Sequence, residues 1–160
     1  MAEGEILLKT EGLTRRFTSG GGLFKPARTM TAVRDVTLAI PRGSVTGVVG
    51  ESGCGKSTLA RLVLRLIERS EGRVAFDGME LNSLPASEMR RLRRRMQMVF
   101  QDPYSSLDPR FTIADVLAEP FRVQGAKADS QVIAQLLSQV GLAPQMALAF
   151  PHQLSGGQRQ

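Results

Sequence analysis

The fold is decided by one stretch of the chain, Gly50-Glu51-Ser52-Gly53-Cys54-Gly55-Lys56-Ser57. It fits the pattern G-x-x-x-x-G-K-[ST]. A β-branched run, Val45 to Val49, precedes it, and apolar residues at helical spacing follow from about Lys56 to Glu68. Glycines in such a position let backbone N–H groups curl around an anion, and the helix N-terminus adds its positive dipole end. The stretch therefore predicts a phosphate-binding loop between a strand and a helix of an α/β fold.

Three side chains of this loop carry its chemistry. Lys56 can reach the β- and γ-phosphates of a nucleotide, and the Ser57 hydroxyl can bind Mg²⁺. Cys54 lies near a helix N-terminus and a lysine, surroundings that favour a thiolate whose alkylation bound nucleotide would slow. The alternatives are that position 54 simply tolerates a small side chain, and that the whole stretch is an ordinary glycine-rich turn.

Outward from this loop, the sequence changes character near residue 100. We expect strands over residues 6–9, 33–40, 45–49, 73–76, 79–81 and 96–100, with Phe17 a few residues past the first. The strands 73–76 and 79–81 are expected to form a hairpin with Asp77-Gly78 as its turn. Only helices are expected beyond: one starting at Thr112 and Asp115 and ended or kinked at Pro120, and one capped by Ser130. We therefore divide the chain into a first part, 1–100, and a helical part, 101–160.

Composition excludes several classes of protein. The chain has 160 residues, 42% hydrophobic and 22% charged, which suits one globular domain. The single cysteine cannot form an internal disulfide, so a reducing compartment is expected. The acidic start does not fit a signal peptide, and the uncharged stretch from Ser130 to Gln158 carries too many Gln and Pro residues for a transmembrane span. Most of the net charge of +6 comes from five arginines between Arg90 and Arg95, typical of a solvated helix face or, alternatively, a polyanion site.

A second glycine motif, Leu154-Ser155-Gly156-Gly157-Gln158, stands near the end of the sequence. Ser155 can cap a following helix, while the two glycines leave backbone amides open to an anion. Taken alone, the motif is equally compatible with a plain loop entering a helix.

The two motifs together, with Gln101 between them at the end of an apolar run, resemble the ATP-binding subunit of ABC transporters. Residues 50–59 and 99–110 look like the oligopeptide/dipeptide (and nickel) importer branch of that family. So do the Gly-Gly-Leu-Phe stretch after Phe17 and the Pro151-His152 pair before the second glycine motif, which resembles the signature sequence of the family and is called the signature loop below. The resemblance runs along essentially the whole chain.

This resemblance implies a role for each motif residue, with ATP and Mg²⁺ as cofactors. The triphosphate would be held by Gly50, Glu51, Ser52, Gly53, Cys54, Gly55, Lys56, Ser57 and Thr58. Lys56 and Gln101 would act in catalysis, Ser57 and Gln101 would ligate Mg²⁺, and Phe17 would stack on adenine. The alternatives for Phe17 are a packed residue beside the first strand, or replacement in this role by Phe24. Ser155, Gly156, Gly157 and Gln158 would contact the γ-phosphate of ATP held by a partner's phosphate loop.

The resemblance also implies a place in an assembly. The fold would be a P-loop nucleotide-binding domain with an α-helical subdomain, working as a head-to-tail dimer with a second ATP-binding subunit. It would dock on membrane permeases at the cytoplasmic face of the inner membrane, would serve a solute-binding protein indirectly, and would bind no nucleic acid. The rival interpretations are a soluble ABC-type ATPase of DNA repair or translation and a basic nucleic-acid-binding module.

The sequence departs from the family pattern after the signature. The Asp-Glu strand and the switch histidine of the family do not occur before Gln160, and His152 precedes the signature and is not that histidine. We therefore expect the first half of an ATPase core plus much of its helical insert. Because the water-orienting Glu is lacking, we expect these 160 residues to bind nucleotide but to hydrolyse it negligibly.

Overall fold

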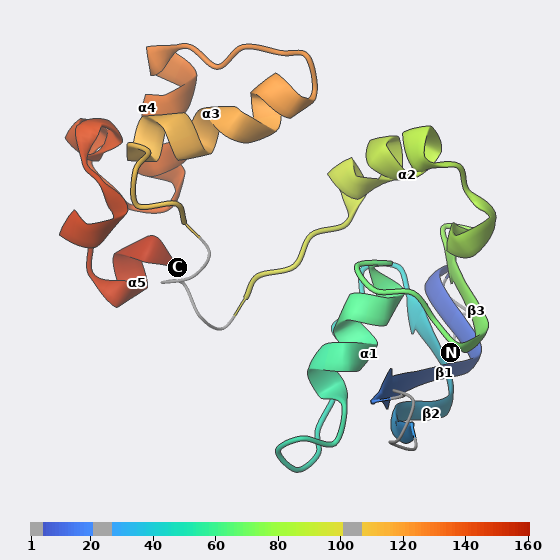
Figure 1. Cartoon of the computed structure of the whole chain (residues 1–160). Helices are drawn as coiled ribbons and strands as arrows, with labels where there is room; N and C mark the ends of the chain where they lie inside the picture. Colours follow the sequence, from blue (N-terminus) through green and yellow to red (C-terminus); the bar gives the residue numbers. More distant parts are fainter. Residues whose placement is uncertain (1–4, 21–26, 101–106) are drawn as a thin grey trace. The chain divides into compact units, whose positions relative to one another are not determined.

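The computed structural model describes residues 5–20, 27–100 and 107–160. The chain divides into two compact units, Met1–Met98 and Val99–Gln160 (Figure 1). Each unit has a hydrophobic core of its own, so each is described by itself.

The first unit is built on a four-stranded antiparallel sheet with the order β2-β1-β3-β4. Its strands are β1 (Ile6–Ser19), β2 (Arg28–Pro41), β3 (Glu71–Phe76) and β4 (Met79–Glu80). The strand predicted over residues 6–9 continues to Ser19, so Phe17 lies inside β1 and not beyond it. The hairpin predicted around Asp77-Gly78 is confirmed, and both turn residues have the positive φ that such two-residue turns require.

One layer of helices covers this sheet. It contains α1 (Lys56–Val63), a 3₁₀ turn η1 (Leu81–Ser83), α2 (Ala86–Leu92) and a second 3₁₀ turn η2 (Arg93–Arg95). Leu62 of α1 and Met89 and Leu92 of α2 pack with Leu13 and Val74 of the sheet in the core. The arginine run therefore has buried neighbours on one side of α2 and solvent on the other.

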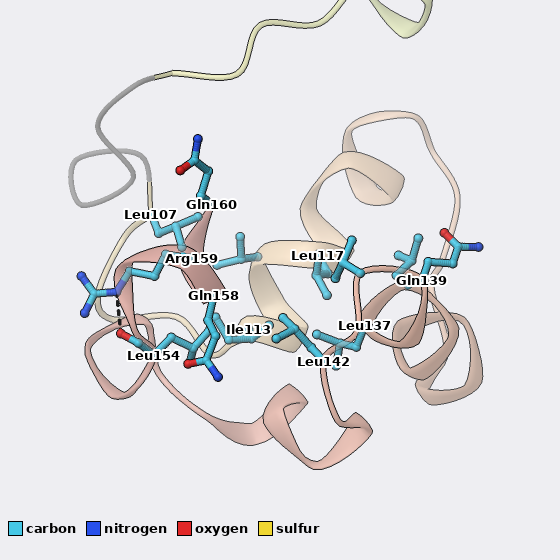
Figure 2. Close-up of a pocket in the computed structure, with 14 residues that line it drawn as sticks. Leu107, Ile113, Leu117, Leu137, Gln139, Leu142, Leu154, Gln158, Arg159 and Gln160 are labelled. Atoms are coloured by element: carbon cyan, nitrogen blue, oxygen red, sulfur yellow. Dashed lines mark hydrogen bonds between the residues drawn. The ribbon is translucent and has the colours of Figure 1, made fainter.

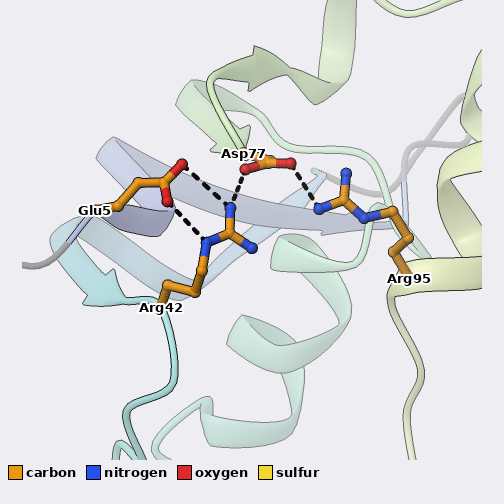
Figure 3. A network of polar contacts seen from close by, with 4 residues as sticks. All are labelled: Glu5, Arg42, Asp77 and Arg95. Carbon is orange, nitrogen blue, oxygen red and sulfur yellow. Dashed lines mark hydrogen bonds and ion pairs between the residues drawn. The ribbon is translucent and has the colours of Figure 1, made fainter.

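A network of charged side chains ties the edges of this unit together (Figure 3). Arg42, just after β2, pairs with Glu5, just before β1, and with Asp77 in the β3–β4 turn. Arg95 of η2 donates to the other oxygen of Asp77 at 2.6 Å. Hydrogen bonds from Arg95 and Arg42 lower the pKa of the Asp77 carboxyl below its ordinary value of 3.8.

Three predictions for this unit are wrong. Residues 45–49 and 96–100 form no strand, and Val45, Val49 and Val99 are almost fully or largely exposed. No described strand pairs with either run, and an apolar run becomes a strand only when a neighbour accepts its backbone hydrogen bonds. The helix from Lys56 ends at Val63 rather than Glu68, because Arg65 adopts a left-handed φ of 49°.

The second unit, as far as it is described, is helical. It contains α3 (Ile113–Val123), α4 (Ser130–Gln139), η3 (Pro144–Leu148), η4 (Pro151–Gln153) and α5 (Gly156–Arg159). The capping box of Thr112 and Asp115 is confirmed, but Pro120 lies inside α3 without ending it. The cap of α4 is Asp129 rather than Ser130, because the Asp129 carboxylate accepts from the Val132 amide. Ile113, Ile133, Leu137 and Leu154 form the core.

Within the described part of the chain, no helix combines the length and the apolar character needed to cross a membrane.

Candidate functional site

The predicted phosphate loop is closed by its own lysine. Helix α1 begins at Lys56, as the sequence indicates, and the Lys56 ammonium donates to the carbonyls of Gly50 at 2.7 Å and Glu51 at 2.6 Å. The Cys54 sulfur lies 3.6 Å from the same nitrogen. The first residues of the loop are thus tied to the first residue of the helix by a single cation.

One glycine of the loop is required by a close approach that only the folded chain creates. Gly55, the N-cap of α1, has a φ of 103°, and a Cβ there would lie 2.2 Å from the carbonyl oxygen of Ala32 in β2. A Cβ on Gly50 would lie 2.8 Å from the Cys54 sulfur, which is the end of a flexible side chain and can turn away. The loop therefore closes on itself at one end and packs directly on the sheet at the other.

The chemical groups that this loop exposes are suited to binding the phosphates of a nucleotide. Loop residues 50–54 and the Ser57 side chain are exposed, so backbone amides and a hydroxyl are accessible at the start of α1. The described partners of the lysine are two carbonyl oxygens and the Cys54 sulfur, and a phosphate oxygen would replace them with a stronger, charge-assisted bond. The Ser57 hydroxyl is the kind of hard oxygen ligand that Mg²⁺ prefers. Gln101, the other expected Mg²⁺ ligand and catalytic residue, lies outside the described residues.

A cavity of about 390 Å³ adjoins the loop. Residues 31–34 of β2 line one side of it, and Cys54, Gly55 and Lys56 line the other. The cavity is therefore continuous with the lysine end of the loop and with the edge strand of the sheet.

Phe17 lies in β1, opposite Met30 of β2, and is half-buried. One face of its ring is covered by the Arg15 guanidinium, whose central carbon lies 4.4 Å from the ring centre. Sequence reasoning missed Arg15 and Ala32, because no motif includes them and their contacts arise from strand pairing. Phe24, the alternative for the stacking role, lies outside the described residues.

The second glycine motif forms a capped helix start. Ser155 is the N-cap of α5, and its hydroxyl accepts from the Gln158 amide at 3.3 Å. The Ser155 amide in turn donates to the Gln158 side-chain oxygen at 2.9 Å. Gly157 has open space around it. Because first-turn amides have no partner within a helix, those of Gly156 and Gly157 are the donors that this motif offers.

An apolar cavity of about 460 Å³ lies beside this motif, within the second unit (Figure 2). Leucine, isoleucine and valine side chains make up most of its wall, and Gly157 to Gln160 close one side. Arg159 bends back over the motif, and its Nε donates to the Leu154 carbonyl at 3.1 Å (Figure 2).

Two arginines of the run between Arg90 and Arg95 make contacts within the first unit. Arg93 donates to the carbonyl of Arg65 at 3.1 Å, and Arg95 is held by Asp77. Arg95 also lies over the ring of Phe76, at 5.3 Å from the ring centre. Part of the basic excess therefore fastens the end of α2 to the sheet.

Comparison with known proteins identifies the family. The ABC transporter family matches residues 33–160. The chain is 46% identical over 160 residues to a probable peptide ABC transporter ATP-binding protein of Sinorhizobium fredii, covering 98% of this chain and 45% of that protein. It is 43% identical over 164 residues to the glutathione import ATP-binding protein GsiA of Salmonella typhimurium, covering 100% of this chain and 26% of that protein.

Comparison with solved structures supports the same family. The ATP-binding cassette MJ0796, in a dimeric post-hydrolysis state bound to ADP and Pi, superposes with a TM-score of 0.77 at 28% identity, over 96% of this chain and 65% of that one. The chain thus spans between about a quarter and two thirds of the length of these proteins. With both glycine motifs at helix starts and a family match over four fifths of its residues, this chain belongs to the ABC transporter family.

Proposed function

We propose that this chain is the ATP-binding part of a subunit that energises an ABC importer of peptides or similar small solutes. The observation that carries the proposal is the exposed phosphate loop that Lys56 bridges at the start of α1. The names of the relatives, a peptide transporter protein and a glutathione import protein, support the class of solute.

In the proposed binding step, the phosphates of ATP replace the two loop carbonyls as hydrogen-bond acceptors of the lysine. Lys56 leaves the carbonyls of Gly50 and Glu51 and turns its ammonium to the phosphates, while the exposed amides of the loop donate to phosphate oxygens. Ser57, with Gln101, would hold Mg²⁺, which neutralises phosphate charge when bound. Phe17 would carry the adenine ring.

In the proposed working unit, Ser155 to Gln158 meets the γ-phosphate of ATP that a second ATP-binding subunit holds. The capping box fixes the backbone of this motif before any ligand arrives, so its amides are already oriented. Such a subunit would hydrolyse ATP to ADP and phosphate, and would dock on membrane permeases at the cytoplasmic face of the membrane. The solute-binding protein would act on it only through those permeases.

Nucleotide binding tests this proposal directly. We expect the full-length protein to bind MgATP in isothermal titration calorimetry and to dimerise in its presence during light-scattering chromatography. Reconstituted with its permeases in liposomes, it should hydrolyse ATP faster when the solute-binding protein delivers a peptide. A protein that binds no MgATP at millimolar concentration contradicts the proposal, and one stimulated by nucleic acid instead supports the repair or translation class.

A further inference from the structure

Arg15 stands on the face of the sheet that carries the phosphate loop. It pairs with Val33 across the β1–β2 ladder, and directly opposite residues of an antiparallel pair point to the same face. The Val33 side chain lies 3.5 Å from where a Cβ of Gly55 would be. Phe17, two residues along β1, shares this face because successive strand residues alternate.

A β-bulge in the β1–β2 ladder lies where the phosphate loop packs against the sheet. The register shifts between Arg15 and Arg16, which leaves Ala32 as the extra residue of β2. Its carbonyl oxygen is the atom on which Gly55 packs. Arg15 is therefore one step along the ladder from the point where the phosphate loop touches the sheet.

The Arg15 guanidinium is fixed by an aromatic ring. Its Nε is buried and has no hydrogen-bond partner among the described residues. Its central carbon lies 4.4 Å from the centre of the Phe17 ring. Burying this one N–H without a partner costs free energy, and attraction of the guanidinium to the π face of the ring offsets part of that cost.

We propose that Arg15 is a positioning residue for the nucleobase, acting through Phe17. It covers one face of the ring and holds the ring in place, so that a purine stacks on the opposite face. Phe17 is half-buried, so part of its side chain is accessible to a ligand. A cation on one face also draws electron density from the ring, which favours stacking of an electron-rich base on the other. This inference rests on the proposed function, because it requires a base to stack on Phe17.

The test measures the dissociation constants of ATP and of inorganic triphosphate for full-length variants by calorimetry. Arg15→Gln should weaken ATP binding about two- to fivefold, the range expected of a cation–π contact, and leave triphosphate binding unchanged. Arg15→Lys, which keeps a cation, should recover most of the loss. Phe17→Ala should weaken ATP binding about fivefold or more.

The control and the double variant separate the possible causes. Arg16→Gln alters the neighbouring arginine, whose guanidinium pairs with Glu71 and whose side chain points to the other face, and should leave ATP affinity unchanged. Because Arg15 acts through the ring, Arg15→Gln combined with Phe17→Ala should bind ATP no more weakly than Phe17→Ala alone.

Each other outcome overturns the inference. Additive losses in the double variant would mean that Arg15 contacts the nucleotide without Phe17. Equal losses for ATP and triphosphate in Arg15→Gln would mean a general structural role. No loss in Arg15→Gln, while Phe17→Ala still loses affinity, would leave the proposed function intact and remove Arg15 from it. A wild-type protein that binds no ATP would remove the proposed function first.

Discussion

The two glycine motifs of this chain each form the start of a helix, but different contacts hold their backbones in place. Each begins a helix and presents backbone amides, but the phosphate loop depends on contacts from elsewhere, whereas the signature loop is self-sufficient. In the first, the Lys56 ammonium bridges two carbonyls and Gly55 packs on Ala32 of the sheet. In the second, Ser155 and Gln158 satisfy each other within four residues.

This difference indicates which substitutions should disrupt each motif. The phosphate loop needs the sheet in place, and its bridging cation is available to a ligand. The signature loop keeps its geometry from its own side chains, so a ligand meets amides that are already fixed. The predictions below test this contrast, beginning with the largest expected effect.

Gly55→Ala tests the dependence on the sheet. Its Cβ would lie 2.2 Å from the Ala32 oxygen at a φ of 103°, so we expect the free energy of unfolding of the first unit to fall by about 2–4 kcal/mol. Gly53→Ala is the matched control, because its φ is 81° but nothing lies near the new methyl; it should cost about 1–2 kcal/mol. Urea unfolding measures both, and equal losses would contradict the proposed role of the contact.

Lys56→Ala tests the bridging cation. It removes the donor that holds Gly50 and Glu51 and would hold phosphate, so ATP affinity should fall about 10- to 100-fold in calorimetry. Lys9→Ala removes a surface lysine that pairs with Glu11 and should leave the affinity unchanged. Equal ATP binding by the Lys56 variant and the wild type would refute the assignment of the loop.

Ser155→Ala tests the self-sufficient motif. Loss of the N-cap should lower the stability of the second unit by about 0.5–2 kcal/mol, and it should weaken ATP-dependent dimerisation while leaving ATP binding by the monomer unchanged. Ser138→Ala is the control, since its hydroxyl only bonds back to Ala134 within α4. A drop in monomer affinity would mean that the signature loop serves its own subunit.

Cys54 reports occupancy of the phosphate loop. Its thiol is exposed and close to Lys56, so MgATP should slow its alkylation by iodoacetamide several-fold in the full-length protein. Mass spectrometry of timed samples gives the rates. The Lys56→Ala variant should show no such protection, and equal rates with and without MgATP in the wild type would count against the site.

Asp77 provides the smallest effect, a pH dependence of the stability of the first unit. Its folded-state pKa lies below the ordinary value of 3.8, so the carboxylate stabilises the fold above that value and loses this effect as pH falls through the lowered pKa. Asp77→Asn, which also tolerates the left-handed φ of 52°, should lower the melting temperature near neutral pH and match the wild type in acid. A constant difference at every pH would contradict this.

Local signals predicted the local features of the fold. Asp77-Gly78 indicated a turn, Thr112 and Ser155 indicated helix caps, and Lys56 marked a helix start, because each feature is decided within four or five residues. The strand predicted over residues 45–49 failed for the opposite reason. Apolar character indicates that a run suits a strand, but pairing requires a neighbour that no local pattern specifies.

In the candidate site, too, the sequence predicted the local features but not the contacts between distant segments. The glycine pattern predicted the loop and its lysine, but the carbonyls that Lys56 binds depend on how the loop curls. The Ala32 contact joins residues far apart in the chain, and Arg15 meets Phe17 only because a strand places alternate residues on one face. Those contacts belong to the sheet and carry no sequence signature.

The bulge at Ala32 has a geometric consequence. Phe17 and the point where Gly55 rests on the sheet are separated by a few rungs of one hydrogen-bonded ladder, whose spacing is set by backbone bonds. A nucleotide that bound at both points, as proposed, would therefore have to match a spacing fixed by the backbone. Inserting one residue into β1 between Arg16 and Phe17 would turn Phe17 to the other face of the sheet and separate it from Arg15, while leaving the contact of Gly55 with Ala32 in place.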